Sequence, residues 1–345
     1  MINATLIGID LGKHCFFAHA HAHAQDARGT QIWRKKMTRK QLYACLATCP
    51  AAVLAMEACA GAHWLGRKGQ SYGHQVRLIA SQFVRPFVKG NKTDFADAEA
   101  ICEAASRSTM RFVAVKTAEQ QTLLALDRVR ESLVRERKAT SNQIHAFLLE
   151  FGIDLPIGAL ATTRLPVLLD EPRHALPPTM VALLLRLHQR YARWSQEIVE
   201  LETQIKQQTL EDEAGQRLLT IPGIGPVTTS SLLAMAGDAR AFKCGRDFAA
   251  SLGLVPRQHL TCGQATLLGI SKRGNKQLRS LLVQGARAVM RFAERRTDAL
   301  GRWLRALLRR RHSNVVACAL ANKMARIVWA ILAKGGEYRA QPAIA

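Results

Sequence analysis

The sequence predicts two kinds of architecture in one chain, an α/β domain at the N-terminus followed by an all-α region. Short apolar runs alternate with helical segments through the first ~110 residues, which is typical of an α/β domain. Beyond about residue 116 the strand patterns end, and leucines and valines recur at helical spacing. A chain of 345 residues is long enough for two or three such domains.

The first domain is expected to span residues 1–112. Its predicted strands are 4–11, 15–24, 29–37, 51–58 and 75–81, with helices at 39–48 and 63–73 between them. A further helix is expected to begin after Thr93, whose side chain suits an N-cap, and to run to about Ser106. Strands that alternate with helices in this way predict one sheet covered by helices.

Three regions follow the α/β domain. Residues 113–212 contain helical patterns at about 116–150 and 179–210, which predict an antiparallel helical hairpin or coiled-coil arm. This arm is either a linker bundle or an oligomerisation element. Residues 213–290 form a helical domain, and residues 291–345 form basic C-terminal helices.

The segment "TIPGIGP" has the pattern of a helix-hairpin-helix. Gly223 and Gly225 flank Ile224 between two apolar helical stretches. Such a turn exposes backbone N–H groups at a helix N-terminus, where a phosphate binds without base specificity. The alternative is a simple helical turn. In a basic chain the pattern favours binding to the DNA backbone.

Charge indicates a polyanionic partner. The chain has 49 Lys and Arg against 26 Asp and Glu, a net charge of +23. Residues 272–311 contain thirteen Lys and Arg but only Glu294 and Asp298 as acids. This density favours nucleic acid over a merely solvated face or an anionic membrane surface. No run of ~18 apolar residues and no signal-peptide pattern is found, so we expect a cytoplasmic, nucleoid-associated protein with no membrane contact.

Cysteine and histidine give no clear metal framework. The eight cysteines are scattered without paired spacing, which favours free thiols in a reducing compartment. His19, His21 and His23 alternate along one face of a predicted strand. Zinc is one interpretation, and an exposed strand face is the favoured one, since no fourth ligand is indicated.

Acidic residues give the sharper signal. Asp10 and Glu57 each end a buried strand, and Asp94 and Asp97 share one face of the helix that follows Thr93. If the two strands are neighbours and the helix packs across them, the four carboxylates meet. Like charges ~4 Å apart repel by ~4 kcal/mol at an effective dielectric near 20, so such a cluster implies a cation. Oxygen ligands select a hard ion, Mg²⁺ or Mn²⁺, which can assist phosphodiester displacement.

The motifs "GIDLGK", "MEACA" and "NKTDFADA" resemble, in order and spacing, the DEDD-type nuclease domain of insertion sequence 110 family transposases, which include the Piv DNA invertase. "TIPGIGP", "FAASLGLVPRQH" and "LGISKRGNKQLRSLLVQGARA" resemble the family's transposase domain, nearest its 1111-like subgroup. The resemblance covers roughly residues 4–150 and 215–290.

This resemblance implies a RuvC-like, ribonuclease-H-like fold with Asp10, Glu57, Asp94 and Asp97 as magnesium ligands. It implies a recombinase that excises and inserts its element, guided by a structured bridge RNA, and that assembles as a dimer or tetramer. A catalytic serine from another subunit's transposase domain would attack the DNA phosphate and form a covalent link.

The chain departs from the family pattern at that serine. Thr261 and Cys262 stand where the family has Ser and Gly. Three interpretations remain open: Thr261 is the nucleophile, Cys262 takes that role, or the copy is impaired. The first is favoured because threonine retains a hydroxyl. Ser271, beside a basic pair, is interpreted as structural or phosphate-binding.

The leading hypothesis is therefore a metal-dependent DNA recombinase of the insertion-sequence type. Motif position makes five side chains candidate phosphate contacts: Lys13, Lys92, Lys272, Arg273 and Arg279. Two rival hypotheses are a RuvC-like nuclease that hydrolyses DNA with water, and a degenerate transposase that only binds nucleic acid. The complete set of acids argues against the second rival, whereas Thr261 and Cys262 argue for it.

Overall fold

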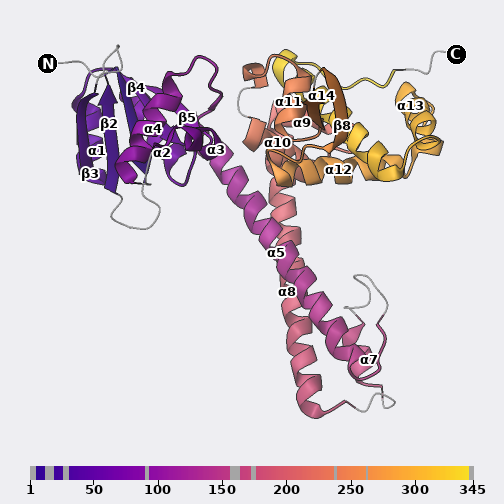
Figure 1. Cartoon of the computed structure of the whole chain (residues 1–345). Coiled ribbons are helices and arrows are strands. Elements are labelled where there is room, and N and C mark those ends of the chain that lie inside the picture. The colour runs from indigo at the N-terminus through magenta and orange to yellow at the C-terminus, as the bar shows by residue number, and fades with distance from the viewer. Residues whose placement is uncertain are drawn as a thin grey trace. The chain divides into compact units, whose positions relative to one another are not determined.

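The chain divides into two units, residues 1–121 and 122–345, and each is considered by itself. Figure 1 shows the computed structural model of the chain. The structure describes residues 5–11, 19–25, 31–89, 93–155, 164–171, 176–236, 239–261 and 263–341.

A six-stranded mixed sheet forms the centre of the first unit. Its strands are β1 (Leu6–Leu11), β2 (His19–Gln25), β3 (Gln31–Thr38), β4 (Val53–Glu57), β5 (Gln75–Ile79) and β6 (Phe112–Val113). They lie in the order β3-β2-β1-β4-β5-β6. The neighbours β1 and β4, and β4 and β5, are parallel, and the other pairs are antiparallel. The five predicted strands are confirmed where the structure describes them, and β6 was not predicted.

Helices cover both faces of this sheet. Leucines from α1 (Arg39–Thr48) and α2 (Ala62–Ser71) pack with Ile7, Ile9, Leu54 and Met56 on one face. The other face is covered by α4 (Asp94–Ser106) and the short α3 (Ser81–Val84) and η1 (Arg85–Phe87). Alternate residues of a strand point to opposite faces, so the sheet has one wide apolar core on each side.

The α4 helix lies very close to β1 at Gly8. A Cβ atom on Gly8 would meet the Ala98 carbonyl oxygen at 2.4 Å and the Cys102 sulfur at 2.7 Å. Small residues dominate the buried face of α4, including Ala98, Ala100, Ala104 and Ala105. Glycine on the strand and alanine on the helix therefore allow a backbone separation that larger side chains would prevent.

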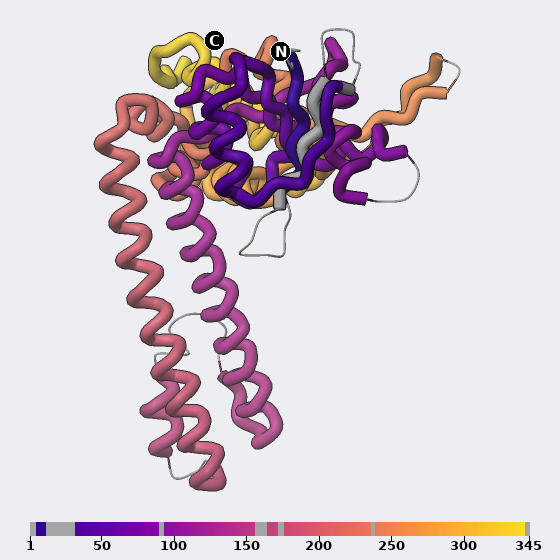
Figure 2. Tube along the Cα trace, turned by 90° about the vertical axis from the view of Figure 1, so that its left-hand side faces the viewer, coloured from indigo at the N-terminus to yellow at the C-terminus, as the bar shows by residue number. Residues whose placement is uncertain are grey.

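Two long helices pair to form the arm seen in Figures 1 and 2, α5 (Ala118–Leu149), nearly all of which is in the second unit, and α8 (Pro178–Glu211). An ion pair joins Arg130 of α5 to Glu202 of α8. Farther along, Ile144 and Leu148 pack with Leu184 and Leu187, and the short α7 (Leu165–Leu169) adds to this cluster. The predicted pair of antiparallel arm helices is confirmed.

A buried acid joins the arm to the helical domain. The Ser231 hydroxyl donates a 2.6 Å hydrogen bond to Oδ2 of Asp127, a buried residue of α5. Burial raises the pKa of Asp127, and the hydrogen bond from Ser231 opposes that rise. The contact fixes α5 against the helix that follows the glycine turn.

The remaining elements are those of the helical domain, whose helices share one core that extends from Leu218 to Ile331. They are α9 (Glu213–Leu219), α10 (Pro226–Ala236), η2 (Ala239–Ala241), α11 (Gly245–Ser251), β7 (Pro256–Thr261), β8 (Gln264–Ile270), α12 (Lys276–Met290), η3 (Ala293–Arg295), α13 (Ala299–Leu308) and α14 (Ser313–Lys334). The β7–β8 ribbon was not predicted. Its residues are almost all exposed, so no core pattern marks it in the sequence.

The α14 helix is long and apolar enough to cross a membrane by length and composition, and 44% of its most apolar window is buried. The sequence expectation concerned an uninterrupted apolar run, and Asn322, Lys323 and Arg326 interrupt this helix. Val316, Leu320, Met324 and Val328 of this helix lie in the core described above. Its apolar character is accounted for by that packing.

Substitution Gly8→Ala should destabilise the first unit. The added methyl would have to displace the backbone of α4, and overpacking of this kind costs about 1–3 kcal/mol. Urea unfolding followed by circular dichroism measures the change. Gly269→Ala is the matched control, because no atom lies within 4 Å of the added Cβ. Equal unfolding midpoints for the two variants would contradict the close packing of α4 on β1.

Candidate active site

Asp10 and Glu57 lie at the carboxyl ends of adjacent parallel strands. The ladder between β1 and β4 pairs Ile9 with Met56, and these two acids come next on each strand. Gly8 contacts α4, and Ala55 belongs to the core beneath α4. Because side chains alternate along a strand, Asp10 and Glu57 are on this same face of the sheet.

The other two acids occupy the first turn of α4. Thr93 caps the helix as predicted, with its hydroxyl accepting a 3.2 Å hydrogen bond from the Ala96 N–H. Asp94 is one helical turn before Ala98, the residue against Gly8, so it continues the row of side chains that faces β1. Asp97 is likewise one turn before the buried Ile101. Both acids extend the sheet-facing stripe of α4.

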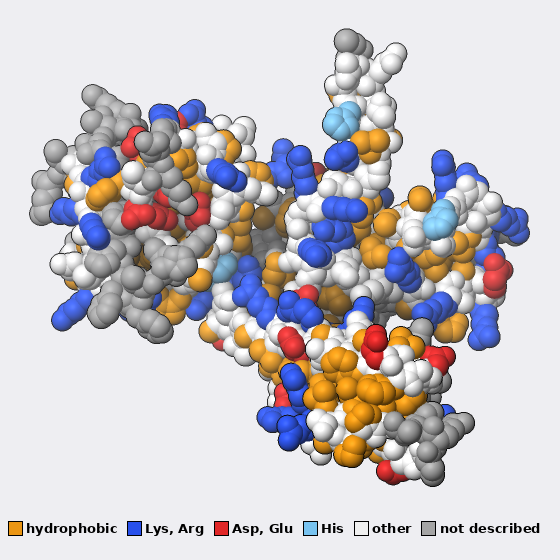
Figure 3. All heavy atoms as spheres, turned by 60° about the horizontal axis from the view of Figure 1, so that its bottom comes forward, with side chains coloured by type: hydrophobic (Ala, Val, Ile, Leu, Met, Phe, Trp, Pro, Cys, Tyr) orange, Lys and Arg blue, Asp and Glu red, His pale blue; other side chains and the backbone are white. Residues whose placement is uncertain are grey.

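The backbone therefore carries all four acids to the side of the sheet that α4 covers. Their side chains do not yet converge: among the described residues, no three His, Cys, Asp or Glu side chains lie close enough to share one ion. Figure 3 shows acidic side chains exposed on the first unit, next to atoms that are not described.

Sequence reasoning missed a partner of Glu57. The Ser81 hydroxyl, at the start of α3, donates a 3.0 Å hydrogen bond to Oε2 of Glu57. Ser81 comes two residues after β5, the strand that neighbours β4. The sequence signal that could have identified Ser81 is its position as a polar residue directly after a strand parallel to β4. This bond leaves the second carboxylate oxygen of Glu57 for another ligand.

For the predicted histidine strand, the structure gives the pairing of the backbone only. His21 pairs with Asp10, and His23 pairs with Gly8, across the β1–β2 ladder. The side chains of His19, His21 and His23 lie outside the described part of the structure. Lys13, Lys92 and Cys262 also fall outside the described residues.

Thr261 ends β7 at the tip of the two-stranded ribbon. Its last ladder partner is Gln264, and the turn contains Gly263 at φ 79°. Figure 2 shows this ribbon, in orange, projecting from its unit. Leu260 and Leu267 are 66% and 65% exposed, so the ribbon has no core beneath it. Thr261 is itself exposed, and its hydroxyl makes no hydrogen bond to a described residue.

The glycine turn of the helix-hairpin-helix is present, but its two glycines differ. Gly223 adopts φ 83° and packs on α12, where a Cβ atom would meet the Gly285 carbonyl oxygen at 2.6 Å. Gly225 is exposed, with nothing within 4 Å of a Cβ atom, and immediately precedes α10. The surroundings of Gly223 give it a packing role. The N–H groups that a phosphate could meet here are those of Gly225 and Val227, because Pro226 at the start of α10 has none.

The segment 271–275 is held by its backbone, while its basic side chains point outward. The Ser271 N–H donates to the Val255 carbonyl at 2.8 Å, and the Lys272 N–H donates to that of Gly253 at 3.2 Å. Lys272 adopts a left-handed φ of 56°. The side chains of Lys272 and Arg273 are exposed, as a phosphate contact requires.

Arg279 has a structural partner that the sequence did not reveal. One guanidinium nitrogen donates to the Leu252 carbonyl at 2.9 Å and to the Arg273 carbonyl at 3.1 Å. The side chain thus joins the end of α11 to the 271–275 segment. If Arg279 also contacts a phosphate, as predicted, it must do so with the guanidinium N–H groups that these two hydrogen bonds leave.

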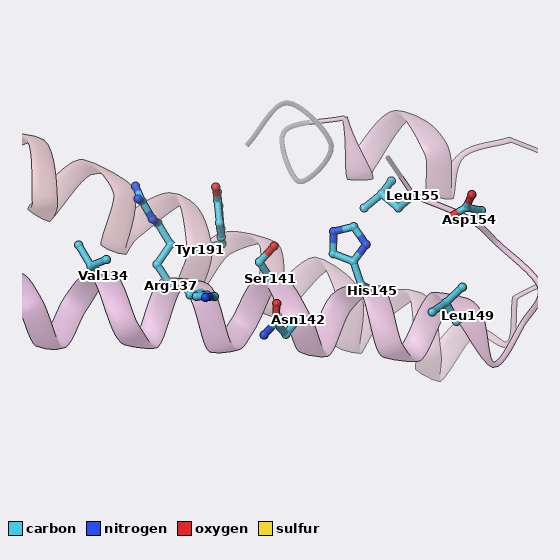
Figure 4. A pocket seen from close by; sticks show the side chains of 10 residues that line it. Val134, Arg137, Ser141, Asn142, His145, Leu149, Asp154, Leu155 and Tyr191 are labelled. Carbon is cyan, nitrogen blue, oxygen red and sulfur yellow. The ribbon is translucent and has the colours of Figure 1, made fainter. Parts of the chain in front are cut away.

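A cavity lies elsewhere, on the arm. Its volume is about 690 Å³, and Figure 4 shows Arg137, Ser141 and His145 of α5 pointing into it, with Tyr191 of α8 beside them. None of the predicted site residues lines it. We therefore assign no part of the proposed reaction to it.

Comparison with known protein families decides the class of protein. Residues 7–153 match the family model of the DEDD transposase of IS110, and residues 215–301 match the "Transposase IS116/IS110/IS902 family". The transposase for insertion sequence element IS1328 of Yersinia enterocolitica is 54% identical over 97% of this chain and 98% of its own. The chain belongs to the IS110 family of transposases.

Two further relatives place this transposase within its family. The transposase for IS1111A of Coxiella burnetii is 40% identical over 98% of this chain and 92% of its own. The pilin gene-inverting protein of Moraxella bovis is 26% identical, with 83% of each chain covered. The predicted membership of the IS110 family, the similarity to its 1111-like subgroup and the relation to a DNA invertase are confirmed. This transposase is an enzyme of DNA transposition, and its DEDD class implies DNA binding and a divalent metal.

Single replacements of Arg279 and Lys272 should differ in their effect on stability, because Arg279 has a structural role and Lys272 is exposed. Arg279→Gln loses two charge-assisted hydrogen bonds and should cost about 1–3 kcal/mol of unfolding free energy. Lys272→Gln removes an equal charge from an exposed side chain, so its melting temperature should stay near that of the wild type. Thermal unfolding measures both. A wild-type melting temperature for Arg279→Gln would contradict its structural role.

Proposed function

We propose that this transposase cuts and rejoins DNA at the ends of its insertion element, using a divalent cation held by four acids and the hydroxyl of Thr261. The observation that carries the proposal is the placement of Asp10, Glu57, Asp94 and Asp97 on the face of one sheet that α4 covers. The matched families support the general activity.

The donor set fits a hard divalent cation. All four candidate ligands are carboxylates, and oxygen-only sets select Mg²⁺ or Mn²⁺ over softer metals. When bound, such an ion supplies Lewis-acid stabilisation of a phosphate under attack. The role of the chain is to hold the acids: the close approach at Gly8 positions α4, and Ser81 orients Glu57.

The strand order supports a RuvC-like, ribonuclease-H-like nuclease domain. Three antiparallel strands, β1 to β3, are followed by β4 and β5 parallel to β1. The acids fall on β1, β4 and the helix that packs over them. We assign residues 1–112 to this nuclease domain, 113–212 to the arm, 213–290 to the transposase domain and 291–345 to basic C-terminal helices.

Thr261 is the proposed nucleophile. Its Oγ1 would bond to the phosphorus as the bond from phosphorus to a deoxyribose oxygen breaks. The hydroxyl proton then passes to that leaving oxygen, by way of solvent. The phosphothreonine link keeps the energy of the phosphodiester for rejoining. An exposed hydroxyl at a ribbon tip can reach DNA, and it depends on the nuclease domain, of this subunit or another, for activation.

The remaining partners follow from the family resemblance. A structured guide RNA, a dimeric or tetrameric assembly, and a place with the DNA in the cytoplasm are parts of the proposal. The net charge of +23 supports a nucleic-acid partner. Lys13, Lys92, Lys272 and Arg273 are proposed phosphate contacts, as are the backbone N–H groups of Gly225 and Val227, since Pro226 between them has none.

A covalent adduct is the decisive product. Protein, Mg²⁺, element-end DNA and the RNA transcribed from the element are incubated, and DNA that migrates with protein after denaturation is measured. The wild type and Cys262→Ala should form the adduct. In Thr261→Ala and Asp97→Asn the amount of adduct should fall at least 100-fold. Thr261→Ser should retain it, because serine keeps the hydroxyl and removes only a methyl.

Other outcomes select the rivals. Metal-dependent cleavage without any adduct would indicate a hydrolytic nuclease. An adduct lost in Cys262→Ala instead of Thr261→Ala would make Cys262 the nucleophile. Tight DNA binding with no cleavage in any reaction would indicate a copy that only binds.

A further inference from the structure

A groove of about 490 Å³ opens between α11 and α14, away from every residue assigned above. Two segments line it, the start of α11 and one face of α14. The lining residues are Cys244, Gly245, Arg246, Lys323, Arg326, Ile327, Trp329 and Ala330. All of them belong to the described part of the second unit.

Tight packing fixes the walls of this groove. Gly245 is buried against α14, where a Cβ atom would lie 3.1 Å from the Cα and carbonyl oxygen of Arg326. The Trp329 indole N–H donates a 3.0 Å hydrogen bond to the Ala239 carbonyl, which fixes the ring. The groove is therefore built into the fold, because closing or widening it would disturb a helix contact with no spare space.

The groove is strongly positive. Arg246, Lys323 and Arg326 are exposed, and none of them forms an ion pair with a residue that the structure describes. The Lys334 ammonium is outside the lining and lies 5.6 Å from the centre of the Trp329 ring. The neighbouring acid is the partly buried Asp247. Like charges gathered in this way repel one another unless an anion compensates them.

Shape and lining fit a nucleic-acid backbone. Cations are present on both lining segments, Arg246 at the start of α11 and Lys323 and Arg326 on α14, and Ile327, Trp329 and Ala330 add apolar surface on α14. Phosphates alternate with less polar sugars along a nucleic acid, so such a lining contacts both. Lysine and arginine side chains also release counterions when they neutralise phosphates. A chain with a net charge of +23 adds long-range attraction to the same class of partner.

We infer that this groove is a second nucleic-acid backbone site, separate from the glycine turn at Gly223 and Gly225. The turn packs on α12, whereas the groove lies where α14 meets α11. Two such surfaces on one unit would hold two stretches of phosphate backbone, from one molecule or from two. The inference deepens the proposed function in its nucleic-acid part, and it does not depend on the metal or on Thr261.

Binding without metal tests the groove independently of catalysis. The full-length chain, in EDTA, is titrated with a random 30-bp DNA duplex and separately with an RNA hairpin of similar length. The double variant Lys323→Gln with Arg326→Gln should bind at least one of them about tenfold more weakly at 0.1 M NaCl. For the duplex, its slope of log K against log salt should fall by about 2, since each lost phosphate contact removes ~0.9.

The control is the double variant Arg190→Gln with Lys206→Gln. It removes the same two positive charges, but from exposed side chains on the arm that do not line the groove. Arg246→Gln, on the opposite wall, should weaken binding in the same direction as the double variant. Loss on DNA alone or RNA alone identifies the source of the phosphates. The inference would be overturned if the double variant bound both nucleic acids within twofold of the wild type, or if the arm control lost as much affinity as the double variant. Because no cleavage is measured, that result would leave the proposed chemistry untouched.

Discussion

The contact between Gly8 and α4 is the constraint on which the proposed metal site depends. Two of the four acids are on strands and two are on the helix, so only the packing of helix on sheet can bring them together. A side chain at position 8 would meet backbone atoms of Ala98. The same strand then carries Asp10 two residues later, and the same helix carries Asp94 one turn earlier. A packing contact with no chemistry of its own thus sets the geometry of the carboxylates.

The second unit is organised by backbone contacts of a similar kind. Gly253 and Gly274 let the 271–275 segment lie directly on the end of α11, and Arg279 joins the two by its guanidinium. The same segment follows β8, the second strand of the ribbon that carries Thr261 at its tip. The arm is fixed to this unit through the buried Asp127. Glycines and a few hydrogen-bonded polar groups therefore determine the positions of the reactive and basic side chains, and the exposed cations remain available to phosphates.

Much of the fold could be predicted from the sequence, because its strands are short apolar runs and its acids end two of them. Asp10, Glu57, Asp94 and Asp97 were identified in this way, and the structure puts them on one face. The sequence could not reveal the β7–β8 ribbon, whose residues are exposed on both faces and leave no period. Ser81 and the structural bonds of Arg279 were missed because their partners, Glu57 and Leu252, are 24 and 27 residues away. Such pairings exist only once the chain has folded.

The central claim is that four carboxylates share a divalent cation, and Mn²⁺ binding to the full-length protein tests it most directly. Titration followed by electron paramagnetic resonance measures the affinity without DNA. Asp10→Asn and Asp97→Asn should each weaken binding at least tenfold. Glu99→Gln, an exposed acid on the same helix, should bind as the wild type does. Unchanged affinity in the first two variants, or an equal loss in Glu99→Gln, would contradict a shared site.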